Sequence, residues 1–220
     1  MFDPPVPSKK VLPTWYKLQE KHPEGKKFVI KETGNIAVTV KSCMPIFDMI
    51  TAGYTITTPA DVYFEKLENG DFDVSWTVNH LKMIESHAIA QYDKHNTPQE
   101  FYPMAYKWIN PWVIQTPPGY SCLILQPTLN DELPFQIIPA IVDTDKHPQA
   151  INFPFFIRRD FDGIIPMGTP MVQVIPFKRE DWVSESFTKP NLEFNAIWEK
   201  AMRRIQNRYK AYFRTIKKWD

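Results

Sequence analysis

The chain has 220 residues, of which 43% are hydrophobic and 23% are charged, so it is long enough to bury one sizeable core. Its formal net charge of +1 excludes a global electrostatic field that would attract nucleic acid or an anionic membrane. The 21 prolines against 7 glycines favour short strands, extended arms and rigid loops over a helical bundle, because proline removes a backbone donor and limits helix length.

Two sequence-wide absences bear on the class of protein. The chain has no apolar run of about 18 residues and no basic-then-apolar leader, so we expect neither a transmembrane span nor secretion by a signal peptide. Cys43 and Cys122 lie far apart and match no metal-ligand spacing. We interpret them as reduced, buried thiols of an intracellular protein.

Residues 1–27 form a proline-rich segment that still carries large apolar side chains, among them Trp15 and Tyr16. Such a segment holds too many prolines to fold alone, so we expect an extended arm that buries these side chains on another surface. That surface is either the domain of the same chain or a neighbouring subunit, and the sequence leaves both open.

Residues 28–183 read as a β-rich core domain. Residues 28–40 alternate around Thr33, Gly34 and Asn35 and predict a hairpin. A short helix is expected over residues 44–50, because Pro45 suits a first helical turn and Gly53 suits a position past a helix end. Further strands are predicted in the next segment, with a tight turn between the second and third: residues 54–59, 62–67 and 72–78.

Residues 80–95 hold three of the five histidines. On a helix, His80 and His87 would share a face and could share a metal ion. No third ligand follows at the usual helical spacing, so we predict no metal site and favour surface or hydrogen-bonded histidines. The aromatic-rich residues 101–112 follow; we interpret them as packing against the core, since a nucleic-acid stacking platform would need more basic residues than Lys107 alone.

Residues 112–177 give the densest strand signal of the chain, a series of short apolar runs closed by Pro, Gly, Asn or Asp. Asp143 and Asp145 stand two apart on a turn, where they either accept hydrogen bonds from turn amides or bind a cation. Arg158 and Arg159 either form a charged strand end or contribute to an anion site.

The later strands resemble trimeric dUTP pyrophosphatases and dCTP deaminases over residues 112–178. The resemblance lies in an apolar strand that ends at Asp143 and in a Gly turn followed by the apolar-Gln-apolar pattern around Gln173. It implies a β-clip fold, a trimer and, in the catalytic alternative, Asp143 as the base that activates water, with Mg²⁺ as cofactor. Five residues are therefore candidates for a ligand site: Asp143, Asp145, Arg158, Arg159 and Gln173.

The chain also departs from that family. Lys146 stands where the family has an aromatic residue against the deoxyribose, and residues 117–121 provide a turn without the arginine of the phosphate-binding motif. No glycine follows Lys178, so the glycine-rich tail that closes over the triphosphate is missing. A triphosphate needs several donors and cations, so we expect the fold without the hydrolase chemistry and assign no catalytic residue and no cofactor.

Residues 184–220 read as a linker followed by a long amphipathic helix over 191–220. One face is aromatic-rich and the opposite face is basic. This helix either folds back on its own sheet, or binds a neighbouring subunit, or lies on a membrane or nucleic acid. The residues predicted to contact other subunits come from the arm and from this helix: Trp15, Tyr16, Trp198, Ile205, Tyr209, Tyr212, Ile216 and Trp219.

The whole chain resembles proteins without an assigned activity that are frequent in tailed bacteriophages. Together with the missing catalytic motifs, this resemblance predicts a non-enzymatic structural or assembly protein of the virion or host cytoplasm. Its expected partners are copies of itself or other protein subunits, and we expect neither a membrane nor a nucleic-acid partner. The alternative is a nucleotide-binding or nucleotide-hydrolysing protein of the dUTP pyrophosphatase type.

Overall fold

A computed structural model describes residues 3–91, 97–186, 192–202 and 208–219 of the chain. By its internal contacts the chain forms two compact units. Unit 1 consists of Met1–Val11 and Gly53–Arg179, and unit 2 consists of Leu12–Ala52 and Glu180–Asp220. None of the described helices is long and apolar enough to cross a membrane.

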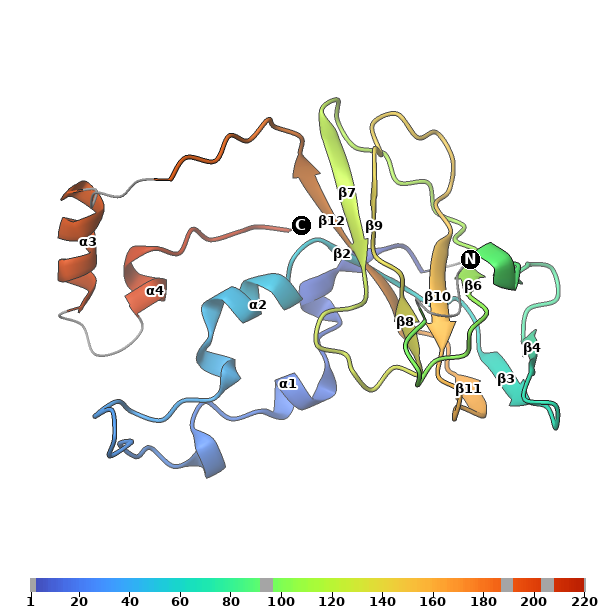
Figure 1. Cartoon of the computed structure of the whole chain (residues 1–220), viewed down its shortest axis with the longest axis horizontal. Coiled ribbons are helices and arrows are strands. Elements are labelled where there is room, and N and C mark those ends of the chain that lie inside the picture. The colour runs from blue at the N-terminus through green and yellow to red at the C-terminus, as the bar shows by residue number, and fades with distance from the viewer. Residues whose placement is uncertain (1–2, 92–96, 187–191, 203–207, 220) are drawn as a thin grey trace. The chain divides into compact units, whose positions relative to one another are not determined.

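The protein is mainly β, as the sequence predicts: its described residues form twelve strands in three antiparallel sheets (Figure 1). The five-stranded sheet has the order β1 (Val6–Pro7), β2 (Tyr54–Thr57), β12 (Pro170–Lys178), β7 (Tyr120–Leu125) and β9 (Ala140–Val142). The four-stranded sheet has the order β5 (Ile84–Ser86), β6 (Tyr106–Trp108), β10 (Phe153–Ile157) and β8 (Phe135–Ile137). The three-stranded sheet has the order β11 (Gly163–Ile165), β3 (Val62–Lys66) and β4 (Phe72–Trp76).

The core of unit 1 is aromatic and draws side chains from all three sheets. Trp108 stacks on Phe155 with ring centroids 4.7 Å apart, and Phe64 meets Tyr106 edge to face at 5.4 Å. All four side chains are at most 3% exposed. The packing interpretation of residues 101–112 is therefore confirmed at β6, whose side chains fill this core.

The first part of the predicted arm belongs to the five-stranded sheet of its own chain. Val6 pairs with Thr55, and the amide of Ser8 donates to the carbonyl of Gly53 at 3.0 Å. The hydroxyl of Thr55 donates to that of Ser8 at 2.9 Å in a buried position. Of the two surfaces considered for the arm, residues 6–8 use the chain itself.

Unit 2 contains the α-helices and little sheet. Its helices are α1 (Thr14–Leu18), α2 (Met44–Ile50), α3 (Leu192–Met202) and α4 (Arg208–Tyr212). Short 3-10 turns occur in both units, at Ser8–Lys10, Pro23–Gly25, Val40–Ser42 and Ile89–Gln91. The helix expected at residues 44–50 is confirmed, with Pro45 in its first turn. The hairpin expected at residues 28–40 is reduced to one bridge between Val29 and Ile36 and its flanking hydrogen bonds.

The structure does not confirm the long C-terminal helix. The described part of residues 191–220 contains α3 and α4, and none of the described residues after Tyr212 is helical. The side chains of Arg214 and Lys217 bind Asp48 of α2, in the part of the chain that follows α4. This long-range ion pairing competes with helical periodicity, and the apolar stripe could not reveal it. The proposed helix start at Asn191 and the stripe residue Ile205 lie outside the described residues.

His80 and His87 would share a face only on an α-helix. The structure has no α-helix over residues 80–91. Strand β5 and the 3-10 turn at Ile89–Gln91 occupy this segment instead. Met83 and Ile84 are buried in the core, and Ile84 pairs with Trp108 of β6, so packing and strand pairing overrode the helical spacing of the histidines. The remainder of the segment, residues 92–96, lies outside the described residues.

Candidate functional site

Three strands of the five-stranded sheet bring charged side chains together at one end of unit 1. In the antiparallel pairing of β7 with β12, Tyr120 is the partner of Lys178, so Arg179 follows immediately beyond the last pair. In the pairing of β7 with β9, Cys122 is the partner of Val142. Asp143 therefore leaves β9 at the same end of the sheet at which Arg179 leaves β12.

The guanidinium of Arg179 is the centre of this group. Its Nη1 atom lies 3.1 Å from Asp143 Oδ1, 2.9 Å from Asp145 Oδ1 and 2.9 Å from the hydroxyl oxygen of Ser121. The Nη2 atom donates to the second carboxylate oxygen of Asp145, which also accepts the amide of Gly119 at 2.8 Å. One arginine therefore binds both carboxylates, Asp145 in a bidentate pair, and its single positive charge leaves the group with one net negative charge.

The two carboxylates differ in exposure and in the cause of their pKa shift. The side chain of Asp145 is 5% exposed, and its hydrogen bonds from Arg179, with help from the Gly119 amide, lower its pKa to about 2. The side chain of Asp143 is 55% exposed, and the Ser121 hydroxyl, followed by the charge of Arg179, lowers its pKa. Both groups are carboxylates at neutral pH, and neither pKa approaches the working pH that suits a general base.

A small cavity adjoins this group. Its volume is about 170 Å³, and it is lined by Val113, Gln115, Thr144, Asp145, Lys146, His147 and Pro148. Pockets for small molecules usually measure about 300–1,000 Å³. The backbone amides of Lys146 and His147 donate to the carbonyl of Asp143, which closes the turn beside the cavity. Of the two carboxylates, that of Asp145 accepts a turn amide, from Gly119, whereas that of Asp143 accepts from side chains, those of Ser121 and Arg179.

The other ligand candidates lie elsewhere in unit 1 and have internal partners. Arg158 forms a two-bond pair with Asp160, with nitrogen-oxygen distances of 3.1 and 3.0 Å. Arg159 donates to the carbonyl of Phe101 at 2.6 Å. Gln173 is 2% exposed, and its side-chain oxygen accepts from the amide and hydroxyl of Thr128. The structure does not bring these side chains to Asp143.

The histidine pair also stays apart from any cluster of ligands. His87 Nδ1 lies 2.8 Å from the side-chain oxygen of Gln91, so its ring is engaged within its own segment. Among the described residues, no three His, Cys, Asp or Glu side chains gather in an arrangement that could hold a metal ion.

The predicted subunit-contact residues fall into two groups in unit 2. Trp198 and Ile216 are 58% and 71% exposed, and the rings of Tyr209 and Tyr212 are also exposed. Tyr16 is 1% exposed, packs edge to face with Trp15, and has the ammonium group of Lys41 over its ring. Tyr16 is therefore a core residue of its own unit, and burial raises its pKa. Trp219 is half-buried in the same unit.

Two groups of residues escaped the sequence argument. Ser121, Gly119 and Arg179 complete the group around Asp145, and only the register of β7 with β12 reveals them. Asp48, Arg214 and Lys217 form the second group, joined over more than 160 positions of the chain. A search for isolated carboxylates on apolar helices would have singled out Asp48, the only acidic residue of α2.

Comparisons of the chain with models of protein families, with curated proteins and with solved structures gave no match.

Proposed function

We propose that this protein is a non-enzymatic structural or assembly protein that binds other protein subunits through the apolar surface of unit 2. The assignment to a bacteriophage virion rests on the resemblance of the whole chain to proteins of tailed bacteriophages. The contacts with other subunits rest on the distribution of apolar side chains, which is a property of the structure itself.

Unit 2 exposes far more large apolar side chains than it buries, and this observation carries the proposal. Its buried hydrophobic residues, within the part that the structure describes, are Tyr16, Ala37, Ile50, Ala52 and Ala201. Its exposed large hydrophobic residues are Leu18, Phe28, Val29, Ile30, Val38, Trp182, Val183, Ile197, Trp198, Tyr209, Tyr212, Phe213 and Ile216. A unit with three alanines among its five core residues lacks the burial that stabilises a small domain, so it gains most from a partner surface.

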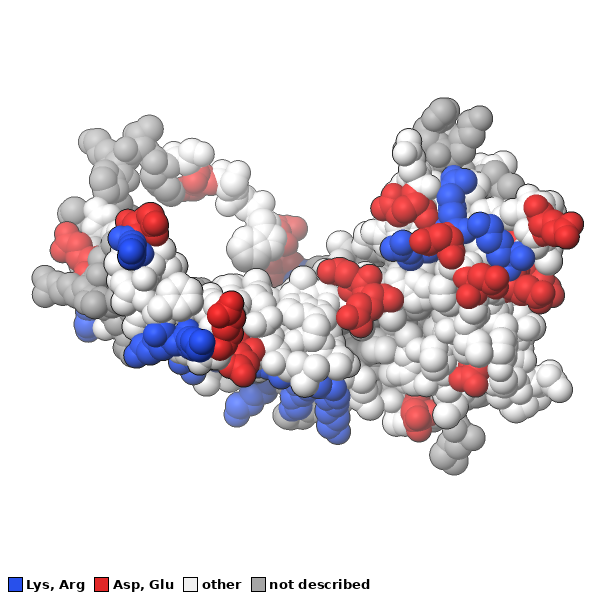
Figure 2. Space-filling model, turned by 90° about the horizontal axis from the view of Figure 1, so that it is seen from below, with Lys and Arg blue, Asp and Glu red and all other residues white. Residues whose placement is uncertain are grey.

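The exposed apolar residues are concentrated on the terminal elements. Leu18 ends α1 at 76% exposure, Trp198 lies on α3, and Ile216 lies in the segment after α4. Trp182 and Val183 follow β12 and are 87% and 85% exposed. On the face drawn in Figure 2, charged side chains gather in groups and leave wide uncharged areas between them. Aromatic anchors of this kind are typical of the buried centre of a protein interface.

The group around Arg179 supports a structural role over the nucleotide-hydrolysing alternative. A triphosphate site needs cations that converge on the phosphates, often with Mg²⁺, and a base beside the attacking water. Arg179 is engaged by both Asp143 and Asp145, and the carboxylates have low pKa values. We also propose a finer fold for unit 1, a β-clip, on the strength of the resemblance over residues 112–178.

The mass of the full-length chain in solution, measured by light scattering over a range of concentrations, tests the proposal. We expect a concentration-dependent oligomer, because the apolar residues of unit 2 find partners on further copies. The double variant Trp198→Ser, Ile216→Ser should weaken association at least tenfold, since each buried side chain of this size contributes about 1.5–3 kcal/mol.

The control is the double variant Val113→Ser, Ile141→Ser in unit 1, whose side chains are 57% and 65% exposed. It removes two exposed apolar side chains from unit 1 and should leave the association unchanged. A full-length chain that stays monomeric at every concentration would contradict self-assembly, and equal weakening by the control would show that general surface hydrophobicity drives it.

A further inference from the structure

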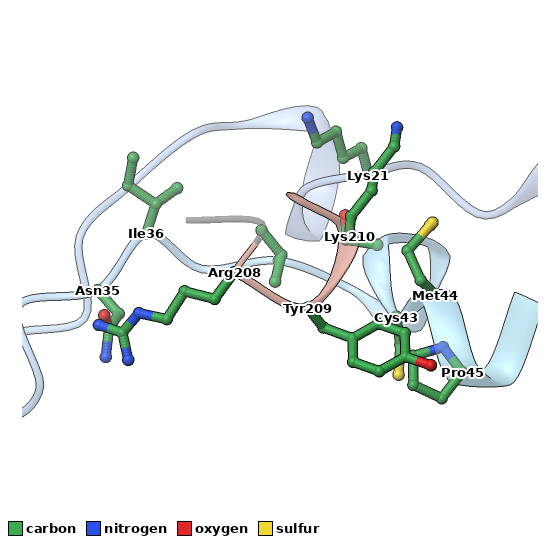
Figure 3. A pocket seen from close by; sticks show the side chains of 11 residues that line it. Lys21, Asn35, Ile36, Cys43, Met44, Pro45, Arg208, Tyr209 and Lys210 are labelled. Carbon is green, nitrogen blue, oxygen red and sulfur yellow. The ribbon is translucent and has the colours of Figure 1, made fainter. Parts of the chain in front are cut away.

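Unit 2 contains a pocket between the start of α2 and α4. Its volume is about 450 Å³, which lies within the range of small-molecule sites. Figure 3 shows Tyr209 of α4 beside Cys43 and Pro45 at the beginning of α2. Ile36 and Val38, from the chain that follows the hairpin turn, complete the apolar part of the wall.

The charged residues of this pocket all have the same sign. Lys21, Arg208 and Lys210 line it, and none of the described lining residues is acidic. The side chains of Lys21 and Lys210 extend toward the same side of the pocket in Figure 3. Since the whole chain carries a net charge of only +1, this is a local concentration of positive charge.

The lining residue Ser42 does not add a hydrogen-bond donor to this wall. Its side-chain oxygen is buried, so a ligand in the open pocket does not reach it. The wall therefore combines apolar side chains and cations.

The two sides of the pocket are tied together beyond it. Asp48 of α2 accepts from Arg214 Nη2 at 2.7 Å and from Lys217 Nζ at 2.8 Å. The side chains of Asp48 and Arg214 are 10% and 13% exposed, so water screens this pair little. These ion pairs hold the segment after α4 on α2 and thereby keep Tyr209 and Lys210 opposite Pro45.

We propose that this pocket binds a small amphipathic anion, a ligand with an aromatic or alkyl body and one carboxylate, sulfonate or phosphate group. The body lies against Ile36, Pro45 and Tyr209, and the anionic group lies among the lysines of the rim. The apolar wall alone would accept a neutral ligand, and the cations alone would accept an inorganic anion, so the combination selects the amphipathic class.

The chain contains its own reporter for this site. Cys43 lines the pocket and is half-buried, whereas Cys122 lies in unit 1 at 1% exposure, where burial raises the pKa of its thiol. A thiol reagent applied to the folded chain therefore modifies Cys43 first, because reaction requires an accessible thiolate. A ligand in the pocket covers Cys43 and slows that reaction.

The experiment measures the rate at which N-ethylmaleimide alkylates Cys43 in the full-length chain, with the site identified by mass spectrometry. Naphthalene-1-sulfonate should slow alkylation in a saturable way. Two further probes test the aromatic body and the negative charge separately. 2-Naphthol is uncharged near pH 7 and supplies only the aromatic body, and inorganic sulfate supplies only the charge. Both should need at least tenfold higher concentrations for half-protection.

The double variant Lys21→Gln, Lys210→Gln should raise the half-protecting concentration of naphthalene-1-sulfonate about tenfold, because two attractive charges are lost. The matched control, Lys26→Gln with Lys200→Gln, removes two lysines of unit 2 that do not line the pocket and should leave protection unchanged. All four lysines are exposed, so the fold should be retained, and each variant without ligand is its own reference. No protection by the sulfonate, equal protection by 2-naphthol, or equal loss in both double variants would overturn the proposal.

Discussion

At the scale of single residues, the pair of Asp145 with Arg179 constrains two turns of unit 1. The carboxylate of Asp145 is almost fully covered, and its two oxygens accept from the guanidinium and from the Gly119 amide. A buried carboxylate remains charged only when such donors surround it. The pair therefore fixes the turns after β9 and before β7. This structural role accounts for Asp143 and Asp145, which the sequence alone suggests as ligand-binding residues.

The pH dependence of unfolding should report this pair. The pKa of Asp145 in the folded chain, about 2, lies below its ordinary value of 3.8, so the unfolded chain binds a proton more readily. The stabilisation is thus complete above the ordinary value and is lost as pH falls through about 2. Urea unfolding of the native chain between about pH 5 and pH 2 should show this loss, and Asp145→Asn should reduce the slope.

The native chain must be compared with the Asp145→Asn variant, because Glu85 also titrates in this pH range. Lys107, with a smaller contribution from Lys82, lowers the pKa of Glu85 to about 2. Glu85→Gln is therefore the matched control, and it should leave the contribution of Asp145 in place. Identical pH slopes for the native chain and Asp145→Asn would contradict a stabilising role for Asp145.

At the scale of elements, the start of β2 depends on a glycine. Gly53 has φ +63°, and a Cβ atom there would collide with the carbonyl oxygen of Val174 in β12. Gly70, in the turn between β3 and β4, has φ +85° and open space around it. Both glycines have a positive φ, but only Gly70 has space around it for a Cβ atom.

Alanine substitutions at these two positions should therefore differ in effect. Gly70→Ala should cost about 1 kcal/mol, the usual cost of a left-handed conformation for a residue with a Cβ atom. Gly53→Ala should cost roughly 3 kcal/mol, because backbone overlap adds to that conformational cost. Urea unfolding midpoints measure both, and equal losses at the two positions would argue against the close approach of β2 and β12.

The ion pairs of Asp48 should decide whether the last residues of the chain stay on α2. Hydrogen bonds from Arg214, the largest cause, and from Lys217 lower the pKa of Asp48, which keeps it charged near neutral pH. Asp48→Asn removes the charge, so we expect faster trypsin cleavage after Arg214 and Lys217, while cleavage in β12 stays unchanged. Lys217→Gln is the milder control, because Lys217 is 44% exposed and Arg214 remains in place; this variant is compared by cleavage after Arg214 alone, since trypsin does not cleave after glutamine. Unchanged cleavage in Asp48→Asn would show that other contacts hold this segment.

At the scale of the whole molecule, the two units differ in how they are stabilised. Unit 1 encloses an aromatic core, with Trp108, Phe153 and Phe155 all at 0% exposure. Unit 2 buries few large side chains and exposes many. We therefore expect unequal local stability, because a unit with little buried apolar surface opens at low free energy.

Hydrogen exchange of the backbone amides can measure this difference. The amides of β7 and β12, central in the five-stranded sheet, should exchange slowest, and those of α1 to α4 should exchange faster in dilute protein. If unit 2 binds further copies of the chain, raising the protein concentration should slow exchange in α1 to α4 and leave β7 and β12 unchanged. Exchange that is independent of concentration in both units would contradict this expectation.

Local signals in the sequence predicted much of the fold. Pro45 and Gly53 bracket α2 as expected, and the alternating runs locate β2, β3 and β4 to within about two residues. Such elements depend on neighbouring residues, so their pattern is visible without the rest of the chain. The arrangement of the strands into three sheets is not visible in this way, because it depends on pairing between distant segments. Val6 pairs with Thr55 of β2, and Tyr54 of β2 pairs with Val174 of β12, 120 positions further along the chain.

The sequence by itself determined the mainly β character and the short helix at residues 44–50. Only the tertiary structure decided which charges meet: Arg179 with Asp145, and Arg214 with Asp48. The same holds for the pocket between α2 and α4 and for the end of the helical pattern at Tyr212. Local propensity depends on a few adjacent residues, whereas ion pairs and pockets depend on strand register and chain path, which the sequence pattern does not specify.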